Sequence, residues 1–226
     1  MVIIVKDETL KKIIYVGIAV IIIFFFTKDI PLLKKEEIIV IDQPEDLLVL
    51  VNKTRMLPSD YIPNDLEEID INYSNHNKYL RKDAREAFET LAKDAKDLGY
   101  FIVAVSAYRD YAYQEDLYQG YVESKGQDYA DKCCAKPGHS EHQTGLSVDV
   151  MGSNLDYDEF ESSPEFEWMS EHAHLYGFIM RYPKGKEDIT GFKYEPWHYR
   201  YVGVETATKI HELGITYDEY YEYFVK

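Results

Sequence analysis

At 226 residues, the chain is long enough for one well-buried domain of average size and an appendage. Its formal net charge of −16 argues against a nucleic-acid partner, because phosphate binding needs clustered lysines and arginines. The two cysteines, Cys133 and Cys134, are adjacent and could pair only through a strained ring, so we expect free thiols rather than a disulfide framework.

The N-terminal segment has the composition of a membrane anchor. Residues 13–26 (IIYVGIAVIIIFFF) contain no charged side chain and follow Lys11 and Lys12. This run is shorter than the roughly 20 apolar residues that span a bilayer, but Thr27 can extend it. Three isoleucines followed by three phenylalanines leave no polar face for a core helix, and no small-x-small cleavage site follows them. We expect an uncleaved anchor, with a cleaved signal peptide as the alternative.

The anchor divides the chain into four regions. Its orientation follows from the two lysines, which hold the short N-terminus in the cytoplasm. The regions are a cytoplasmic N-terminus over residues 1–12, a transmembrane helix over 13–30, a stalk over 31–43 and a domain over 44–226. The protein would therefore be a single-pass protein of the cell membrane with its domain outside.

The first part of the domain combines apolar runs with polar turns. The apolar residues 47–51 predict a first strand, and the prolines, Asp and Asn of residues 54–77 predict a mostly irregular stretch. Apolar residues at three- and four-residue steps over 82–98 predict a helix, which Gly99 ends.

The middle of the domain contains two expected strands and a second helix. Residues 100–107 (YFIVAVSA) predict a buried strand. A helix is expected over 111–124, with its inward-facing residues being Tyr113, Leu117, Tyr121 and Val122. In residues 145–151, three aliphatic residues alternate with Ser147 and Asp149. The two-residue period of a strand therefore puts Asp149 on the face opposite the aliphatic side chains.

The C-terminal part of the chain contains further short elements. The expected elements are a helix over 164–176, strands over 178–182 and 194–202, and a closing helix over 205–213. Strands and helices are mixed without a regular βαβ order. The sequence therefore predicts an α+β fold with a small, mainly antiparallel sheet flanked by helices, in addition to the N-terminal transmembrane helix.

Two motifs supply the residues of a hydrolytic metal site. The first, PGHSEHQTGLSVDV, contains His142 and Asp149, and the second, EPWHYR, contains Glu195 and His198. Three nitrogen and oxygen ligands with an unused carboxylate nearby are typical of a catalytic zinc site, in which one coordination position stays open for water. Each motif is weak evidence alone, since a lone His or Asp in a loop is usually solvated. Together they point to a hydrolase.

The remaining histidines are weaker candidates for metal ligands. His172 and His174 form a His-x-His pair, but their segment is expected to be helical, where residues two apart point to opposite sides. His139 could support the first motif or contact a substrate. His76 and His211 lie in polar surroundings and are expected at the surface.

Arg109 follows the buried strand over residues 100–107. Strand ends often present active-site residues, and a guanidinium there can stabilise a developing oxyanion. From spacing alone, a structural ion pair with Asp110 or Asp116 is an equally open alternative.

Four segments keep the order and spacing of the motifs of one enzyme family. They are SAYRDYAYQ, PGHSEHQTGLSVDV, YGFIMRYPKGKEDITGF and YEPWHYRYVG. In these segments, from roughly residue 43 onward, the chain resembles the VanY-type D-alanyl-D-alanine carboxypeptidases, zinc peptidases related to D-Ala-D-Ala dipeptidases. The adjacent Cys133 and Cys134 depart from the family pattern, which raises the possibility of a redox-sensitive rim.

The resemblance implies a role for each residue of the site. The family pattern Ser-x-His-x-x-Gly-x-x-x-Asp falls on Ser140, His142, Gly145 and Asp149, and Glu-x-x-His falls on Glu195 and His198. It implies a Zn2+ ion bound by His142, Asp149 and His198. It also implies Glu195 as the general base and Arg109 as the polarising cation. Gln114 and Ser140 would lie near the peptide terminus.

Sequence and resemblance together predict a membrane-anchored zinc D,D-carboxypeptidase. It would remove the C-terminal D-alanine from peptidoglycan stem peptides. One alternative is an L,D-carboxypeptidase that acts on tetrapeptides. A second, from a different class, is a zinc-containing cell-wall-binding module without catalysis. The presence of Glu195 beside a complete ligand set argues against that second alternative.

Overall fold

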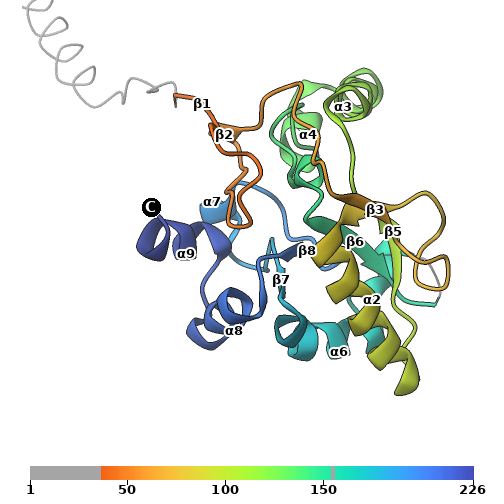
Figure 1. Cartoon of the computed structure of the whole chain (residues 1–226). Helices are drawn as coiled ribbons and strands as arrows, with labels where there is room; N and C mark the ends of the chain where they lie inside the picture. The colour runs from red at the N-terminus through yellow and green to blue at the C-terminus, as the bar shows by residue number, and fades with distance from the viewer. Residues whose placement is uncertain (1–36, 154–155) are drawn as a thin grey trace, which may run out of the picture. The chain divides into compact units, whose positions relative to one another are not determined.

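The computed structural model describes residues 37–153 and 156–226 (Figure 1). Residues Ile38–Lys226 form a compact unit. The predicted cytoplasmic N-terminus over 1–12, the predicted transmembrane helix over 13–30 and the first part of the predicted stalk, residues 31–36, lie outside the described residues. Within the described ranges, none of the helices combines the length and apolarity needed to cross a membrane.

A four-stranded sheet forms the centre of the domain. Its strands are β5 (Val103–Ser106), β6 (Ser147–Met151), β7 (Phe178–Met180) and β8 (His198–Tyr201). They lie in the order β5-β6-β8-β7, and each neighbouring pair is antiparallel. The predicted α+β fold with a small antiparallel sheet is therefore confirmed.

Two small sheets lie outside the central one. β3 (Leu66–Glu68) and β4 (Tyr79–Arg81) form an antiparallel pair. β1 (Ile39–Val40) pairs in parallel with β2 (Arg55–Met56), so the end of the predicted stalk is joined to the domain by backbone hydrogen bonds.

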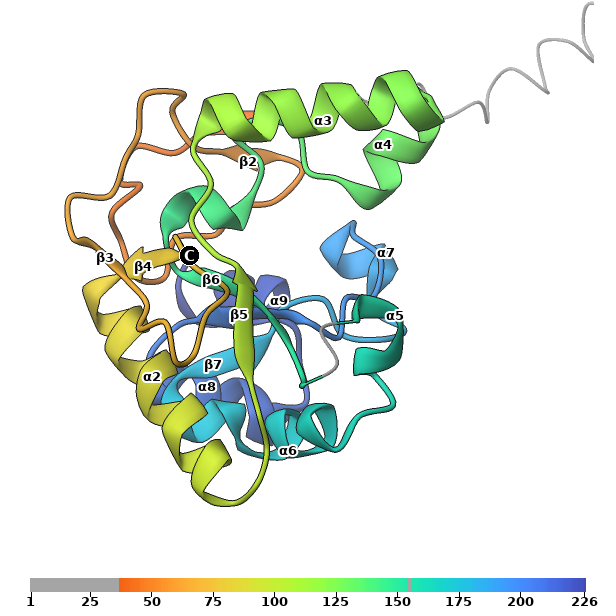
Figure 2. The ribbon, with the colours of Figure 1, turned by 90° about the vertical axis from the view of Figure 1, so that its right-hand side faces the viewer.

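Helix α2 (Lys82–Asp97) matches the helix predicted from its apolar spacing. Its buried residues Phe88 and Leu91 share a hydrophobic core with Val148 and Val150 of the central strand β6. The helix ends before Gly99, whose φ of +95° is a conformation that other residues rarely adopt. The same core includes residues of helix α6 (Pro164–His172), which Figure 2 shows beside α2.

The remaining helices complete the fold. They are α3 (Tyr111–Lys125), α4 (Gln127–Cys133), α5 (Tyr157–Phe160), α7 (Glu187–Thr190), α8 (Val204–Leu213) and α9 (Tyr217–Phe224), with 3-10 turns η1 (Glu141–Thr144) and η2 (Ala173–Tyr176). In Figures 1 and 2, α3 and α4 lie at the end of the domain opposite α6 and α8.

The predicted strand over residues 47–51 is wrong. This segment is buried in part but forms no strand in the described structure. The carbonyl oxygens of Leu47 and Val49 accept hydrogen bonds from the guanidinium of Arg200 instead of from a neighbouring strand. Arg200, which follows these two residues by 153 and 151 positions, thus provides the hydrogen bonds that the pattern had assigned to a neighbouring strand.

Helix α3 is confirmed, and two of its four predicted inward residues, Leu117 and Val122, pack against a buried cluster, but the prediction is wrong for Tyr113 and Tyr121. The side chains that α3 buries are Gln114 and Tyr118, whereas Tyr113 is 58% exposed and Tyr121 is 36% exposed. Tyr118 packs on the unpredicted helix α4, in a cluster with Ala130. The two exposed tyrosines line the cavity described below.

Candidate metal centre and active site

Neighbouring strands bring the second and third predicted ligands together. Asp149 of β6 stands opposite His198 of β8 in the antiparallel register. Residues that face each other across two strands point to the same side of the sheet. Asp149 lies opposite the aliphatic face, as the alternation in its strand predicts, since Val148 and Val150 are in the core.

His142 reaches the same point from the turn that precedes β6. It lies in η1, and Gly145 connects this turn to the strand with a φ of +66°. A Cβ atom on Gly145 would come within 2.9 Å of Leu66 and 3.0 Å of Arg81. Glycine is therefore required here both by the backbone conformation and by the close approach of β3 and β4.

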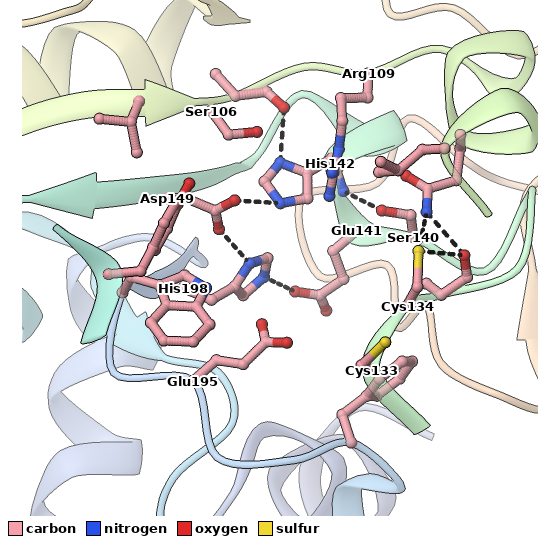
Figure 3. A pocket seen from close by; sticks show the side chains of 18 of the residues that line it. Ser106, Arg109, Cys133, Cys134, Ser140, Glu141, His142, Asp149, Glu195 and His198 are labelled. Carbon is pink, nitrogen blue, oxygen red and sulfur yellow. Dashed lines mark hydrogen bonds and ion pairs between the residues drawn. The ribbon is translucent and has the colours of Figure 1, made fainter. Parts of the chain in front are cut away.

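The donor atoms of the three residues converge (Figure 3). His142 Nε2 lies 3.3 Å from one oxygen of Asp149, and His198 Nδ1 lies 2.8 Å from the other. All three residues are buried, and one ligand atom from each falls within 4.8 Å of the others. This is the arrangement that the two motifs predicted.

The protonation chemistry of the cluster fits a zinc ion. His142 Nδ1 lies 2.6 Å from the carbonyl oxygen of Ala107 and can donate to it, which leaves Nε2 free as a ligand. Burial and the nearby charge of Arg109 lower the pKa of His142 to about 4, so the ring is neutral at neutral pH, as a metal ligand must be. Two histidine nitrogens and a carboxylate are ligands that zinc prefers.

The cluster also favours a cation electrostatically. Burial opposes the ionisation of Asp149, but His142 and His198 outweigh it and hold the pKa of this carboxyl well below its usual range. Burial likewise opposes a charge on His198, but hydrogen bonds to Asp149 and Glu141 outweigh it and raise its pKa to about 9. Positive charge is thus stabilised at the point that a metal ion would occupy.

Glu195 is placed beside the cluster by a turn before β8. The backbone N–H of His198 donates to the carbonyl oxygen of Glu195 at 3.2 Å, which brings the two side chains to the same cavity. Burial raises the pKa of Glu195 to about 7, and the neighbouring His198 only partly offsets this. A carboxyl group with a pKa near neutrality is suited to accept and return a proton.

Arg109 lies in the loop between β5 and α3, where its backbone N–H donates to the carbonyl oxygen of His142 at 3.3 Å. Its Nε is buried without a hydrogen-bond partner among the described residues. Asp110, one of the expected ion-pair partners, instead caps α3 by accepting from Tyr113 N. The guanidinium therefore remains available to the cavity.

Gln114 and Ser140 also line the cavity. The amide nitrogen of Gln114 donates to the carbonyl oxygen of Ala135 at 2.7 Å, and its side-chain oxygen is buried without a partner in the described part of the chain. Ser140 caps η1, with its hydroxyl accepting from His142 N at 3.4 Å. Both side chains are held in place by these contacts.

One cavity of about 1020 Å3 contains all seven predicted site residues. Helices α3 and α4 contribute an aromatic part of its wall, with Tyr121 and Tyr129 at a ring-centroid distance of 6.3 Å. Cys133 and Cys134 lie on the same wall as free thiols, as predicted. Burial raises the pKa of both thiols, that of Cys134 to about 11, which disfavours the reactive thiolate form and weighs against a redox-sensitive rim.

The other histidines lie apart from this cluster. His139 is buried, and its Nδ1 lies 2.8 Å from the carbonyl oxygen of Asn52. His174 and His211 stack on each other with ring centroids 3.8 Å apart. His172 stacks on Trp168. The prediction that these histidines are not ligands agrees with the structure, since the metal cluster found among the described residues comprises His142, Asp149 and His198.

Sequence reasoning missed two residues that contact His198. Tyr182 stacks on its ring, with centroids 4.9 Å apart. Glu141 lies 3.6 Å from its Nε2. The only available signal was the position of Glu141 inside the first motif, and nothing in the pattern distinguished it from a solvated residue.

Comparison with known proteins found a matching family model and several similar proteins and structures. A family model described as VanY, D-alanyl-D-alanine carboxypeptidase, matches residues 77–204. The Bacillus subtilis (strain 168) protein YodJ is 43% identical over 189 residues, which are 80% of this chain and 69% of YodJ. The structure of the LdcB LD-carboxypeptidase is 42% identical, with a TM-score of 0.78 over 82% of this chain and 90% of the other.

A second solved structure carries the metal. A variant of the vancomycin-resistance D,D-pentapeptidase VanY in complex with Zn(II) is 33% identical, with a TM-score of 0.66 over 76% of this chain and 97% of the other. The fold and the His–Asp–His cluster define a zinc peptidase. The chain belongs to the VanY family of D-alanyl-D-alanine carboxypeptidases, which are hydrolases that act on peptidoglycan peptides.

Proposed function

We propose that this chain removes the C-terminal D-alanine from peptidoglycan stem peptides, with Glu195 as the general base. The observation that carries the proposal is a carboxyl group of pKa about 7 in the same cavity as the buried ligands His142, Asp149 and His198. A binding module would need no such group. A hydrolase needs one to accept a proton from water and return it to the leaving amine.

Each residue of the cavity has a proposed part in this reaction. Zinc, when bound, polarises the scissile carbonyl and makes water more acidic. Glu195 accepts the proton of the attacking water and passes it to the amine that departs. Arg109, whose Nε has no partner in the described structure, stabilises the negative charge that develops on the carbonyl oxygen.

The free carboxylate of the substrate is the feature that a carboxypeptidase must recognise. Ser140 can offer its hydroxyl proton from the cavity wall, and Gln114 would donate to the carboxylate by exchanging the contact that its amide nitrogen makes with the carbonyl oxygen of Ala135. We propose that these two groups lie near the terminal carboxylate. Cleavage should therefore fall sharply when that carboxylate is amidated, and equal cleavage of amidated and free peptides would contradict an exopeptidase.

The relatives divide between two substrates. The likeness to LdcB, at 42% identity and a TM-score of 0.78, favours an L,D-carboxypeptidase that trims tetrapeptides. The lower likeness to the VanY D,D-pentapeptidase, at 33% and 0.66, supports the D,D reaction on pentapeptides that the sequence predicted. We propose the tetrapeptide as the preferred substrate and the pentapeptide as the second candidate.

Mass spectrometry of stem peptides tests both the proposed reaction and the preferred substrate. The purified, zinc-loaded chain is incubated with matched tetrapeptide and pentapeptide, and released D-alanine is measured. We expect release from both, with the larger kcat/KM for the tetrapeptide. A larger value for the pentapeptide would assign the D,D reaction. No release from either peptide, under conditions where zinc is bound, would instead support a non-catalytic module.

The location of the domain remains a proposal of its own. The uncharged run over residues 13–26 and the lysines that precede it support a membrane anchor with the domain outside the cell. This would place the cavity where peptidoglycan is found.

A further inference from the structure

Glu141 is a fully buried carboxylate next to the metal cluster. It lies in η1, directly before His142, and its side chain is 0% exposed. A buried carboxylate is costly unless opposite charges and hydrogen-bond donors surround it. Its two oxygens have different surroundings, and this difference suggests its role.

The first oxygen, Oε1, is held by two buried arginines. Arg181 Nε donates to it at 2.7 Å and Arg200 donates through a terminal nitrogen at 3.1 Å. Arg181 also pairs with Asp218 of α9 at 2.5 Å. Two carboxylates and two guanidinium groups balance in charge, so Glu141 stays ionised and fixed in orientation.

The second oxygen, Oε2, faces the metal cluster. It accepts a hydrogen bond from Ser147 Oγ at 3.3 Å and lies 3.6 Å from Nε2 of His198 (Figure 3). That nitrogen is buried and has no hydrogen-bond partner at ordinary distance among the described residues, so Glu141 Oε2 at 3.6 Å is the acceptor that faces it. The other nitrogen of the same ring, Nδ1, faces Asp149 at 2.8 Å.

We propose that Glu141 is a positioning residue for His198, which holds the proton of this ring on Nε2 and so keeps Nδ1 available as a metal ligand. The proposal rests on the ligand set His142, Asp149 and His198. Ligating histidines commonly donate their second N–H to a carboxylate or a backbone carbonyl, which fixes the tautomer and the ring. For His142, the acceptor of this second N–H is the carbonyl oxygen of Ala107, and for His198 it is Glu141.

The substitution Glu141→Gln tests the role of the charge. The two arginines are donors only, so the amide oxygen would face them and the amide NH2 would face His198. A donor facing Nε2 favours the tautomer with its proton on Nδ1, which competes with metal binding. We expect the zinc dissociation constant, measured by chelator competition on the full-length chain in detergent, to rise about 10- to 100-fold.

Asp218→Asn is the matched control. It removes a negative charge from the same buried network and breaks the pair with Arg181, but Asp218 does not contact His198. If Glu141 acts through His198, Glu141→Gln weakens zinc binding and shifts the visible absorption bands of the cobalt-substituted protein, whereas Asp218→Asn changes neither. Both variants should lower the melting temperature.

The outcomes separate positioning from general stability. An unchanged zinc dissociation constant in Glu141→Gln would overturn the proposal, as would an equal loss in Asp218→Asn. If Glu141→Gln does not fold, Glu141→Asp provides the same test, because it keeps the charge on the arginines but shortens the reach to His198. Failure of the wild-type chain to bind zinc would instead refute the ligand set itself.

Discussion

At the residue scale, the three ligand atoms make zinc binding dependent on each of His142, Asp149 and His198. Replacing any one of them with alanine leaves two donors, too few to hold the ion in competition with water. We expect metal analysis of His142→Ala to show less than about a tenth of an equivalent of zinc.

His139→Ala is the control for this metal prediction. His139 is also buried and lies three residues before the ligand, but its ring contacts the carbonyl oxygen of Asn52 and not the metal cluster. It should therefore retain a full equivalent of zinc. A full equivalent in His142→Ala would show that the ligand assignment is wrong.

Glu195 determines the expected dependence of activity on pH. Only its ionised form accepts a proton, so activity falls as the pH drops through its pKa. Burial raises that pKa to about 7, and the charge of a bound zinc ion would lower it. The acid limb of kcat/KM should therefore have its midpoint at or below about pH 7, and a midpoint clearly above 7 would contradict the assignment.

Glu195→Gln removes the base without removing a ligand. The amide cannot accept the proton, so kcat should fall by several orders of magnitude while zinc content and melting temperature stay close to wild type. Turnover near the wild-type rate would exclude Glu195 as the base.

At the element scale, Gly145 links η1 to β6 and so sets where His142 stands relative to Asp149. Both Gly145 and Gly185 have positive φ, at +66° and +78°, but a Cβ on Gly185 would meet nothing within 4 Å. Alanine at either position incurs the cost of the left-handed backbone, about 1–2 kcal/mol. Gly145→Ala adds collisions with Leu66 and Arg81, about 1–3 kcal/mol more.

Chemical denaturation of the two glycine variants measures this difference. We expect Gly145→Ala to lose more free energy of unfolding than Gly185→Ala, and to lose activity as η1 moves. Equal losses would mean that the space around Gly145 relaxes without consequence for the site.

The spacing of apolar residues along the sequence correctly predicted the helices and strands that bury one face. The aliphatic alternation around Asp149 and the apolar spacing of α2 both reflect a single buried face, and both predictions are confirmed. On α3, the prediction of an inward position was wrong for Tyr113 and Tyr121, because these two side chains line a cavity. An amphipathic tyrosine gives the same signal whether it faces a core or a substrate pocket.

Long-range contacts explain what the sequence could not predict at the site. The ligands were predicted because their motifs carry a recognisable set of residue types. The environment of Glu141 was not, because its partners Arg181 and Arg200 follow 40 and 59 residues later. Arg200 also satisfies the carbonyl oxygens of Leu47 and Val49, so the same side chain accounts for the strand that does not form there.

At the scale of the whole molecule, the N-terminal sequence predicts how the chain is oriented across the membrane. Lys11 and Lys12 precede the uncharged run over residues 13–26, and positive charge favours the cytoplasmic side. The domain should therefore lie outside and remain attached to the membrane. Its strong acidity does not conflict with this, since a solvated acidic surface suits either compartment.

Protease added to intact cells tests this orientation. We expect the domain to be degraded from outside while a cytoplasmic marker protein stays intact, and the domain to sediment with membranes before treatment. The double variant Lys11→Glu, Lys12→Glu should leave a larger fraction of the domain protected, because it removes the charge that sets the direction. Complete protection of the wild-type domain would contradict the predicted orientation, whereas recovery of the domain in the medium would indicate a cleaved signal peptide.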